Sequence, residues 1–126
     1  MSKISDYVHT ADAGQEKHVP LIELPENPSA GAMFNILVSV GKTITHPNTA
    51  EHHIAWIALH FIPAGAKFSI EIGRQELSAH GQGDGPAHTD GTALFRMKTL
   101  VPGTLVATAY CNIHGLWTND ATLTLA

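Results

Sequence analysis

Cysteine is the scarcest informative residue of this sequence, with one among 126 residues. One cysteine excludes an internal disulfide, and a single unpaired thiol predicts a reducing, cytoplasmic location. A chain of this length buries roughly two-thirds of its unfolded surface without any covalent staple, and we expect one domain spanning residues 1–126. The start, Met1 to Tyr7, also lacks the apolar segment of a signal peptide.

Basic residues and long apolar runs are scarce as well. Lys and Arg together number seven against eleven Asp and Glu, and the formal net charge is −4. So few basic residues provide no cationic surface for nucleic acid or for an anionic membrane, and neither partner is expected. The longest apolar run, Ile54 to Ala64, contains His60 and is too short to span a bilayer.

Histidine, in contrast, is abundant, with nine residues in a chain that is only 14 % charged. The most informative run is Tyr110-Cys111-Asn112-Ile113-His114-Gly115-Leu116-Trp117. The thiolate of Cys111 and the imidazole of His114 can share one tight turn and bind one metal ion, and their softness favours iron, copper or zinc. Free N–H groups of Ile113 and His114 in that turn can hydrogen-bond the sulfur. On its own, the pair also fits an inert cysteine buried in an apolar strand.

A second group of histidines lies upstream, in the run His46-Pro47-Asn48-Thr49-Ala50-Glu51-His52-His53. Asn48 followed by Glu51 has the form of a capping box, so we predict one helical turn between the histidines. Such a turn would bring His46 and His52 back toward one point, where they could bind a metal. His53 would then lie on the opposite face. A hydrogen-bonded polar turn without a metal is the alternative.

The rest of the chain alternates short β-prone runs with Pro- and Gly-rich turns, and no convincing long helix occurs. The strands that we predict cover 21–24, 32–40, 54–62, 68–72, 93–101 and 104–110, with a last one that begins at 118–120 and continues through 121–126. Seven short strands at regular spacing are typical of an all-β, immunoglobulin-like β-sandwich or barrel. Because the histidine groups and the cysteine all lie at strand ends, we expect the metal site at one rim.

Two kinds of metal protein fit a β-sandwich with these residues. A blue-copper electron carrier needs a soft axial ligand shortly after its second histidine. Leu116 and Trp117 occupy those positions and Met97 precedes the cysteine, which disfavours copper. The other interpretation uses five donors, too many for a closed tetrahedral zinc site but suited to a five-coordinate iron with one open position. These donors are His18, His46, His52, Cys111 and His114.

Three runs of the sequence resemble the signatures of superoxide reductase in its one-iron form, the neelaredoxins. They are Glu16-Lys17-His18-Val19-Pro20, His46-Pro47-Asn48 with Glu51-His52-His53, and Cys111 to Trp117. The resemblance continues in order from about residue 15 to the C-terminus and includes Gly73-Arg74 and Ala79-His80-Gly81. The two-iron form carries an additional cysteine-ligated iron centre, which a chain with one cysteine cannot build.

The resemblance implies a mononuclear non-haem iron site. Its equatorial ligands would be His18, His46, His52 and His114. Cys111 would be the axial ligand, and the sixth position would be open in the ferrous state and taken by Glu16 in the ferric state. The implied reaction is the one-electron reduction of superoxide to hydrogen peroxide, with rubredoxin or a similar small carrier as electron donor. Members of this form are commonly cytoplasmic homotetramers.

Lys17 and Glu16 are the candidate catalytic residues beside the ligands. Ferrous iron with four neutral imidazoles and one thiolate carries a formal charge of +1, which attracts an anion. Lys17 should point away from its neighbour His18, toward the mouth of the site, where its charge would steer superoxide inward and relay protons. Glu16 should act as a displaceable cap. The sequence leaves open a superoxide dismutase, which shares the reductive half of the reaction, and an electron-transfer or metal-storage protein.

Overall fold

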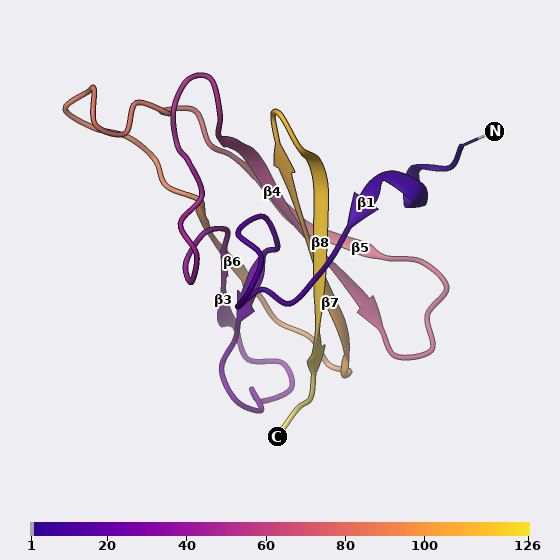
Figure 1. Ribbon diagram of the computed structural model, residues 1–126. Helices are drawn as coiled ribbons and strands as arrows, with labels where there is room; N and C mark the ends of the chain where they lie inside the picture. The colour runs from indigo at the N-terminus through magenta and orange to yellow at the C-terminus, as the bar shows by residue number, and fades with distance from the viewer. Residues whose placement is uncertain (1) are drawn as a thin grey trace.

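The computed structural model describes residues 2–126, which form two β-sheets packed into a sandwich (Figure 1). A 3-10 helix, η1 (Ile4–Tyr7), precedes the strands. The strands are β1 (Val8–His9), β2 (Leu21–Glu23), β3 (Phe34–Ser39), β4 (Ile54–Pro63), β5 (Ile70–Glu76), β6 (Thr92–Met97), β7 (Gly103–Cys111) and β8 (Gly115–Leu123). The all-β sandwich is therefore confirmed, and the two-residue β1 adds a strand that the sequence did not predict.

One sheet has the order β1-β8-β7-β4-β5 and the other has the order β2-β3-β6. All neighbouring strands are antiparallel except β1, which pairs in parallel with the start of β8. No helix within residues 2–126 has the length and apolarity that crossing a membrane requires. The β7–β8 hairpin tip and the 41–53 loop lie at the same end of the molecule in Figure 1, and this end carries the candidate site.

Strand β7 delivers the cysteine to that end. Its inward-facing residues are Leu105, Ala107, Ala109 and Cys111. All four are buried against the second sheet, where Ile36 and Val38 of β3 are fully buried in the same core. Because side chains alternate along a strand, Cys111 continues the apolar series and is the last member of it. The thiol therefore lies where the hydrophobic core ends and the loops begin.

The strand boundaries differ most from the sequence prediction in β5, β6 and β8. Strand β6 ends at Met97 instead of residue 101, and β8 ends at Leu123 instead of residue 126. Strand β5 begins at Ile70 and runs to Glu76, while Phe68, expected within a half-buried strand, is 83 % exposed. β5 is an edge strand that pairs only with β4. Its residues are exposed or half-buried on both faces, although apolar and polar residues alternate at its start. Strand β8 begins at Gly115, directly after the turn, because its ladder with β7 closes on the pair Cys111–Gly115.

Candidate metal centre

The turn between β7 and β8 holds the cysteine and a histidine side by side. Gly115 has a φ of +80°, a conformation that glycine adopts without strain, and it lets the chain reverse after residue 114. The backbone N–H of His114 donates to Cys111 Sγ at 3.4 Å, as the sequence predicted, and His114 Nδ1 lies 3.7 Å from the same sulfur. Ring nitrogen and thiol therefore face one point from a single turn.

The loop before β4 carries His46 and His52, but the helical turn predicted between them is wrong. Thr49 and His52 instead exchange backbone hydrogen bonds, with N···O distances of 2.9 and 3.2 Å. Asn48, the expected cap, donates its side-chain amide to the Thr89 carbonyl and accepts from His80 Nδ1 at 3.0 Å. The loop thus uses its capping residue to bind another loop, which leaves no cap for a helix.

His18 enters from the polar loop before β2. Its Nδ1 lies 2.7 Å from Glu16 Oε1, and the same oxygen accepts the His18 backbone N–H at 2.8 Å. Burial raises the pKa of Glu16, but the hydrogen bonds from His18 outweigh it and the pKa is lowered overall. A carboxylate bound to Nδ1 leaves Nε2 to face the centre, where it lies 3.2 Å from His114 Nδ1.

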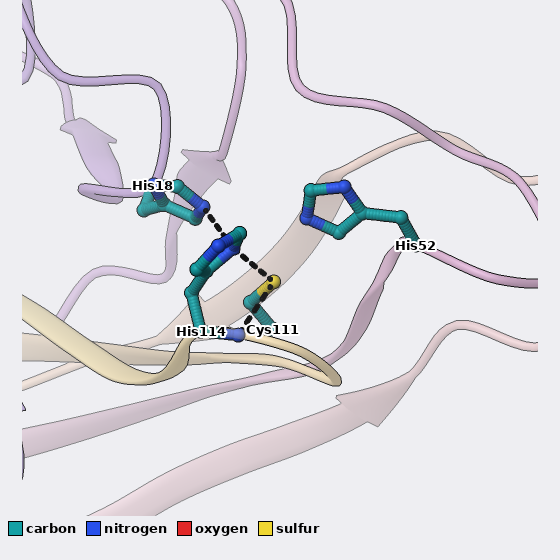
Figure 2. A group of neighbouring side chains, drawn as sticks. All are labelled: His18, His52, Cys111 and His114. Carbon is teal, nitrogen blue, oxygen red and sulfur yellow. Dashed lines mark hydrogen bonds between the residues drawn. The ribbon is translucent and has the colours of Figure 1, made fainter.

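Four of the expected ligands converge (Figure 2). The donor atoms of His18, His52, Cys111 and His114 all lie within 4.8 Å of one another. They come from the loop before β2, the loop before β4, the end of β7 and the hairpin turn, so segments from most of the chain meet here. The prediction that these four residues share one site agrees with their placement.

His46 stands just outside this group but adjoins it. Its ring centroid lies 4.7 Å from that of His52 and 4.9 Å from that of His18, both in edge-on orientation. Its Nδ1 donates to the Pro47 carbonyl at 2.7 Å, which leaves the lone pair on Nε2. Among the described residues, the Nε2 atoms of His46 and His52 are buried without any hydrogen-bond partner.

The electrostatics of the loop keep these two imidazoles neutral. Burial lowers the pKa of His46 from 6.5 to about 4 and outweighs the hydrogen bond to the Pro47 carbonyl, which raises it. The neighbouring His18, His52 and Lys17 lower this pKa further. Burial also lowers the pKa of His52, again with the Lys17 charge among the smaller causes. A neutral imidazole is the form that binds a metal, so the site is prepared for a cation at neutral pH.

The two candidate catalytic residues lie at the edge of the cluster. Glu16 is engaged with His18 and does not belong to the group of converging donors. Lys17 is half-buried, and its ammonium is near enough to influence both His46 and His52. Glu16 and Lys17 lie close to the cluster because they directly precede His18 in the chain.

Trp117 is a site residue to which the sequence assigned no role. Its ring stacks on His18 with a centroid distance of 4.7 Å and an interplanar angle of 15°. Its indole N–H donates to the His114 carbonyl at 3.2 Å. One side chain therefore contacts two candidate ligands from distant segments. An aromatic residue three positions after a histidine was the available signal, but only the fold brings His18 beneath it.

The donor set fits an iron ion. Buried polar atoms in proteins are almost always hydrogen-bonded, so the two unpartnered Nε2 atoms of His46 and His52 require another partner. A metal coordinated by imidazoles and one thiolate supplies it, and such mixed nitrogen and sulfur donors suit a transition metal and exclude calcium and magnesium. His18, Cys111 and His114 complete the set.

Comparison with known proteins agrees with this geometry. The family described as Desulfoferrodoxin matches residues 10–120. Neelaredoxin from Megalodesulfovibrio gigas is 48 % identical over 128 residues, which cover 98 % of this chain and 98 % of the relative. Superoxide reductase from Pyrococcus furiosus is 46 % identical over 125 residues, covering 95 % of this chain and 98 % of the relative.

A solved structure extends the likeness to three dimensions. Superoxide reductase (neelaredoxin) from Archaeoglobus fulgidus in the reduced form superposes with a TM-score of 0.86 at 48 % identity. The superposition covers 94 % of this chain and 99 % of that structure. Sequence and fold thus match over nearly the whole length, and the range matched by the family spans the candidate metal centre from His18 to His114. The chain belongs to the desulfoferrodoxin family.

Proposed function

We propose that this protein is a superoxide reductase, which converts superoxide, one electron and two protons into hydrogen peroxide. The observation that carries the proposal is the convergence of the only cysteine with three histidines within 4.8 Å, beside a fourth histidine with an unpartnered, buried Nε2. The relatives named superoxide reductase and neelaredoxin support the same reaction.

The metal would be a single iron held by five protein atoms. These are Nε2 of His18, His46 and His52, Nδ1 of His114 and Sγ of Cys111. Iron held by these residues would supply one-electron redox chemistry, with an external donor as the source of the electron. The N–H of His114 withdraws charge from the Cys111 sulfur and so moderates how strongly the thiolate donates.

Glu16 would have two alternative positions. In the conformation described here, Glu16 Oε1 fixes the ring of His18. A carboxylate is a usual outer hydrogen-bond partner of a metal-bound imidazole. To cap the metal as a sixth ligand, the carboxylate would have to exchange both hydrogen bonds to His18 for that contact. The two bonds to His18 favour the position in which Glu16 does not cap the metal. As a cap, Glu16 would therefore be displaceable.

Lys17 would act on the approach of the substrate. Its charge is felt at His46 and His52, so an anion drawn to the ammonium arrives next to the cluster. A lysine at the mouth of a site raises the local concentration of an anionic substrate. The same ammonium can pass protons to the product through water.

The wider assignments rest on the family resemblance and on the sequence. We propose a small electron-transfer protein such as rubredoxin as the donor, a homotetramer as the assembly and the cytoplasm as the location. The unpaired thiol of Cys111 supports a reducing compartment. We also propose that residues 1–126 act as one domain, because strands from β1 to β8 all contribute to the sheets that carry the site.

The decisive experiment combines metal analysis with superoxide titration of the reduced protein. We expect one iron per chain, its oxidation by superoxide, and peroxide as product without oxygen. Release of oxygen would indicate a superoxide dismutase. Iron that superoxide does not oxidise would indicate an electron carrier or a storage protein, and both outcomes would refute the proposed function.

A further inference from the structure

Asn112 lies between two candidate ligands, Cys111 and His114, but its side chain reaches out of the hairpin turn. Its Oδ1 accepts the backbone N–H of His53 at 2.8 Å, and its Nδ2 donates to the backbone carbonyl of Glu51 at 2.9 Å. Its own backbone N–H donates to the His53 carbonyl at 3.1 Å. Three hydrogen bonds thus join this one residue to a segment about sixty positions away in the chain.

The two residues that Asn112 binds flank His52. A side-chain amide has the same donor and acceptor as a peptide group, so it can pair with the carbonyl of residue 51 and the N–H of residue 53 as a neighbouring strand would. The regular ladder between β4 and β7 ends with the pair Ile54–Cys111, after a register shift. The amide of Asn112 therefore continues the pairing beyond the point where the backbone ladder stops.

The opposite side of His52 is held by Thr49. The N–H and carbonyl of His52 both bond to the Thr49 backbone, and the Thr49 hydroxyl accepts the same N–H at 3.1 Å. Every backbone polar group from the Glu51 carbonyl to the His53 carbonyl consequently has a partner within residues 2–126. With its backbone fixed on both sides, the His52 ring has little freedom in its distance from the sulfur of Cys111.

We propose that Asn112 is a positioning residue that sets His52 against Cys111, so that the hairpin and the 41–53 loop bind the metal as one unit. The inference rests on the proposed metal site, but it concerns metal affinity and needs no superoxide chemistry. Asn112 does not touch the metal or the substrate, and it acts through His52 alone.

Only a short side chain with both a donor and an acceptor fits this role. Asn112→Ala removes both side-chain bonds. Asn112→Asp keeps the acceptor for the His53 N–H but sets a carboxylate oxygen against the Glu51 carbonyl, which repels it. Asn35→Ala is the matched control, because the Asn35 side chain makes one hydrogen bond, to Arg96, on an exposed part of β3.

The test is the dissociation constant of Co²⁺, titrated anaerobically into the full chain prepared without metal and followed by the thiolate-to-cobalt absorption band. Loss of an outer partner of a metal ligand typically weakens binding by roughly 10- to 100-fold. We expect this loss for Asn112→Ala and at least as much for Asn112→Asp, with Asn35→Ala unchanged. If Asn112→Ala binds Co²⁺ as tightly as the unaltered chain, the positioning role is refuted while the metal site stands. If the unaltered chain binds no Co²⁺, the metal site itself is refuted.

A double-mutant cycle separates positioning from a general loss of structure. In a His52→Gln background, Asn112→Ala should weaken Co²⁺ binding no further, because the residue through which it acts is gone. In a His46→Gln background it should retain its full effect. An equal effect of Asn112→Ala in both backgrounds would show that it disturbs the whole site, and would overturn the proposed route through His52.

Discussion

The hairpin turn after β7 and the 41–53 loop each bring two candidate ligands to the candidate metal centre, but they do so by different means. The hairpin is the end of a continuous ladder from Gly103 to Cys111, so its ligands are placed by strand register and one turn. Within the described residues, the loop has no helix or strand. Hydrogen bonds that belong to no ladder, to Thr89, His80 and Asn112, hold it in place. Candidate ligands on regular structure can thus be located from sequence alternation, while the positions of candidate ligands on the loop depend on partners that only the fold supplies.

The same contrast extends to the ring nitrogens that face the centre. His114 adjoins the sulfur within the turn and presents Nδ1, the nitrogen nearer its backbone. His46 reaches in from the loop with Nε2, because the Pro47 carbonyl binds its Nδ1. The histidine in the tight turn thus faces the sulfur with the nitrogen nearer its backbone, and the histidine on the loop has its farther nitrogen free.

The largest effect should come from the hairpin. Cys111→Ser replaces the thiolate with a weakly donating hydroxyl, so we expect loss of the sulfur-to-ferric charge-transfer colour and of most turnover. Metal affinity should fall by more than the roughly 10- to 100-fold that loss of an outer partner costs. Visible absorption of the oxidised protein is the measurement. An unchanged spectrum would mean that Cys111 is not a ligand.

Replacing glycine with alanine should lower stability more at Gly41 in the loop than at Gly115 in the hairpin turn. Gly41 and Gly115 both have positive φ, of +89° and +80°, but a Cβ at Gly41 would lie 2.7 Å from the His46 backbone nitrogen, while nothing lies within 4 Å of one at Gly115. Left-handed geometry alone costs an alanine about 1–2 kcal/mol. We expect Gly115→Ala to lose that much and Gly41→Ala to lose more than about 3 kcal/mol of unfolding free energy, with displacement of His46.

Gly65→Ala provides the control for this pair, measured by denaturant unfolding. Gly65 has a φ of +78° with nothing within 4 Å of a Cβ, and it lies in a turn remote from the cluster. It should lose the same stability as Gly115→Ala and leave metal affinity unchanged. Equal losses at Gly41 and Gly65 would show that the close approach to His46 is relieved without cost.

Acid should lower the free energy of unfolding of the metal-free protein. The pKa of His46 is about 4 in the folded chain and 6.5 in the unfolded chain. Between these values the unfolded chain binds a proton that the folded chain does not, so the free energy of unfolding decreases as pH falls through this window and is constant above it. We expect a loss on the order of 2 kcal/mol between pH 7 and pH 4, to which His52 adds with the same sign.

His46→Gln removes this titration and should flatten the pH dependence of unfolding. The measurement is the denaturant midpoint of both chains at several pH values, without metal. A slope that is equal in the two chains would assign the acid sensitivity to groups other than His46.

The smallest effect should come from Lys17, which belongs to neither region and acts before the substrate arrives. Electrostatic steering changes association rates by about tenfold or more and is screened over roughly 8–10 Å at physiological salt. We therefore expect Lys17→Ile to slow superoxide capture about tenfold at low salt. Lys17→Arg should restore most of the rate, and the difference should shrink as salt is raised. If arginine fails to rescue and salt has no effect, Lys17 acts by delivering protons or by holding the Glu16 loop.

The fold class and the placement of Cys111 beside His114 in one turn could be predicted from the sequence, because both follow from alternation and turn chemistry. Cys111 ends an apolar series in β7, and Gly115 marks the turn. The loop conformation could not, because Asn48 and Glu51 suggest a local cap while Asn48 actually binds Thr89 and His80. The stacking of Trp117 on His18 could not be predicted from the sequence either, since it joins residues about one hundred positions apart. Local rules fail where a side chain has a distant partner.

The complete burial of Cys111 has a consequence for how long such a catalyst survives. Hydrogen peroxide, the product of the proposed reaction, oxidises thiolates in proportion to their exposure, through sulfenic acid to irreversible forms. The Cys111 side chain has no solvent-accessible surface, and the His114 N–H lies against its sulfur. Peroxide that has reached solvent therefore has no exposed sulfur to attack at Cys111. The packing that places this thiol at the candidate metal centre also shields it from the product of the proposed reaction.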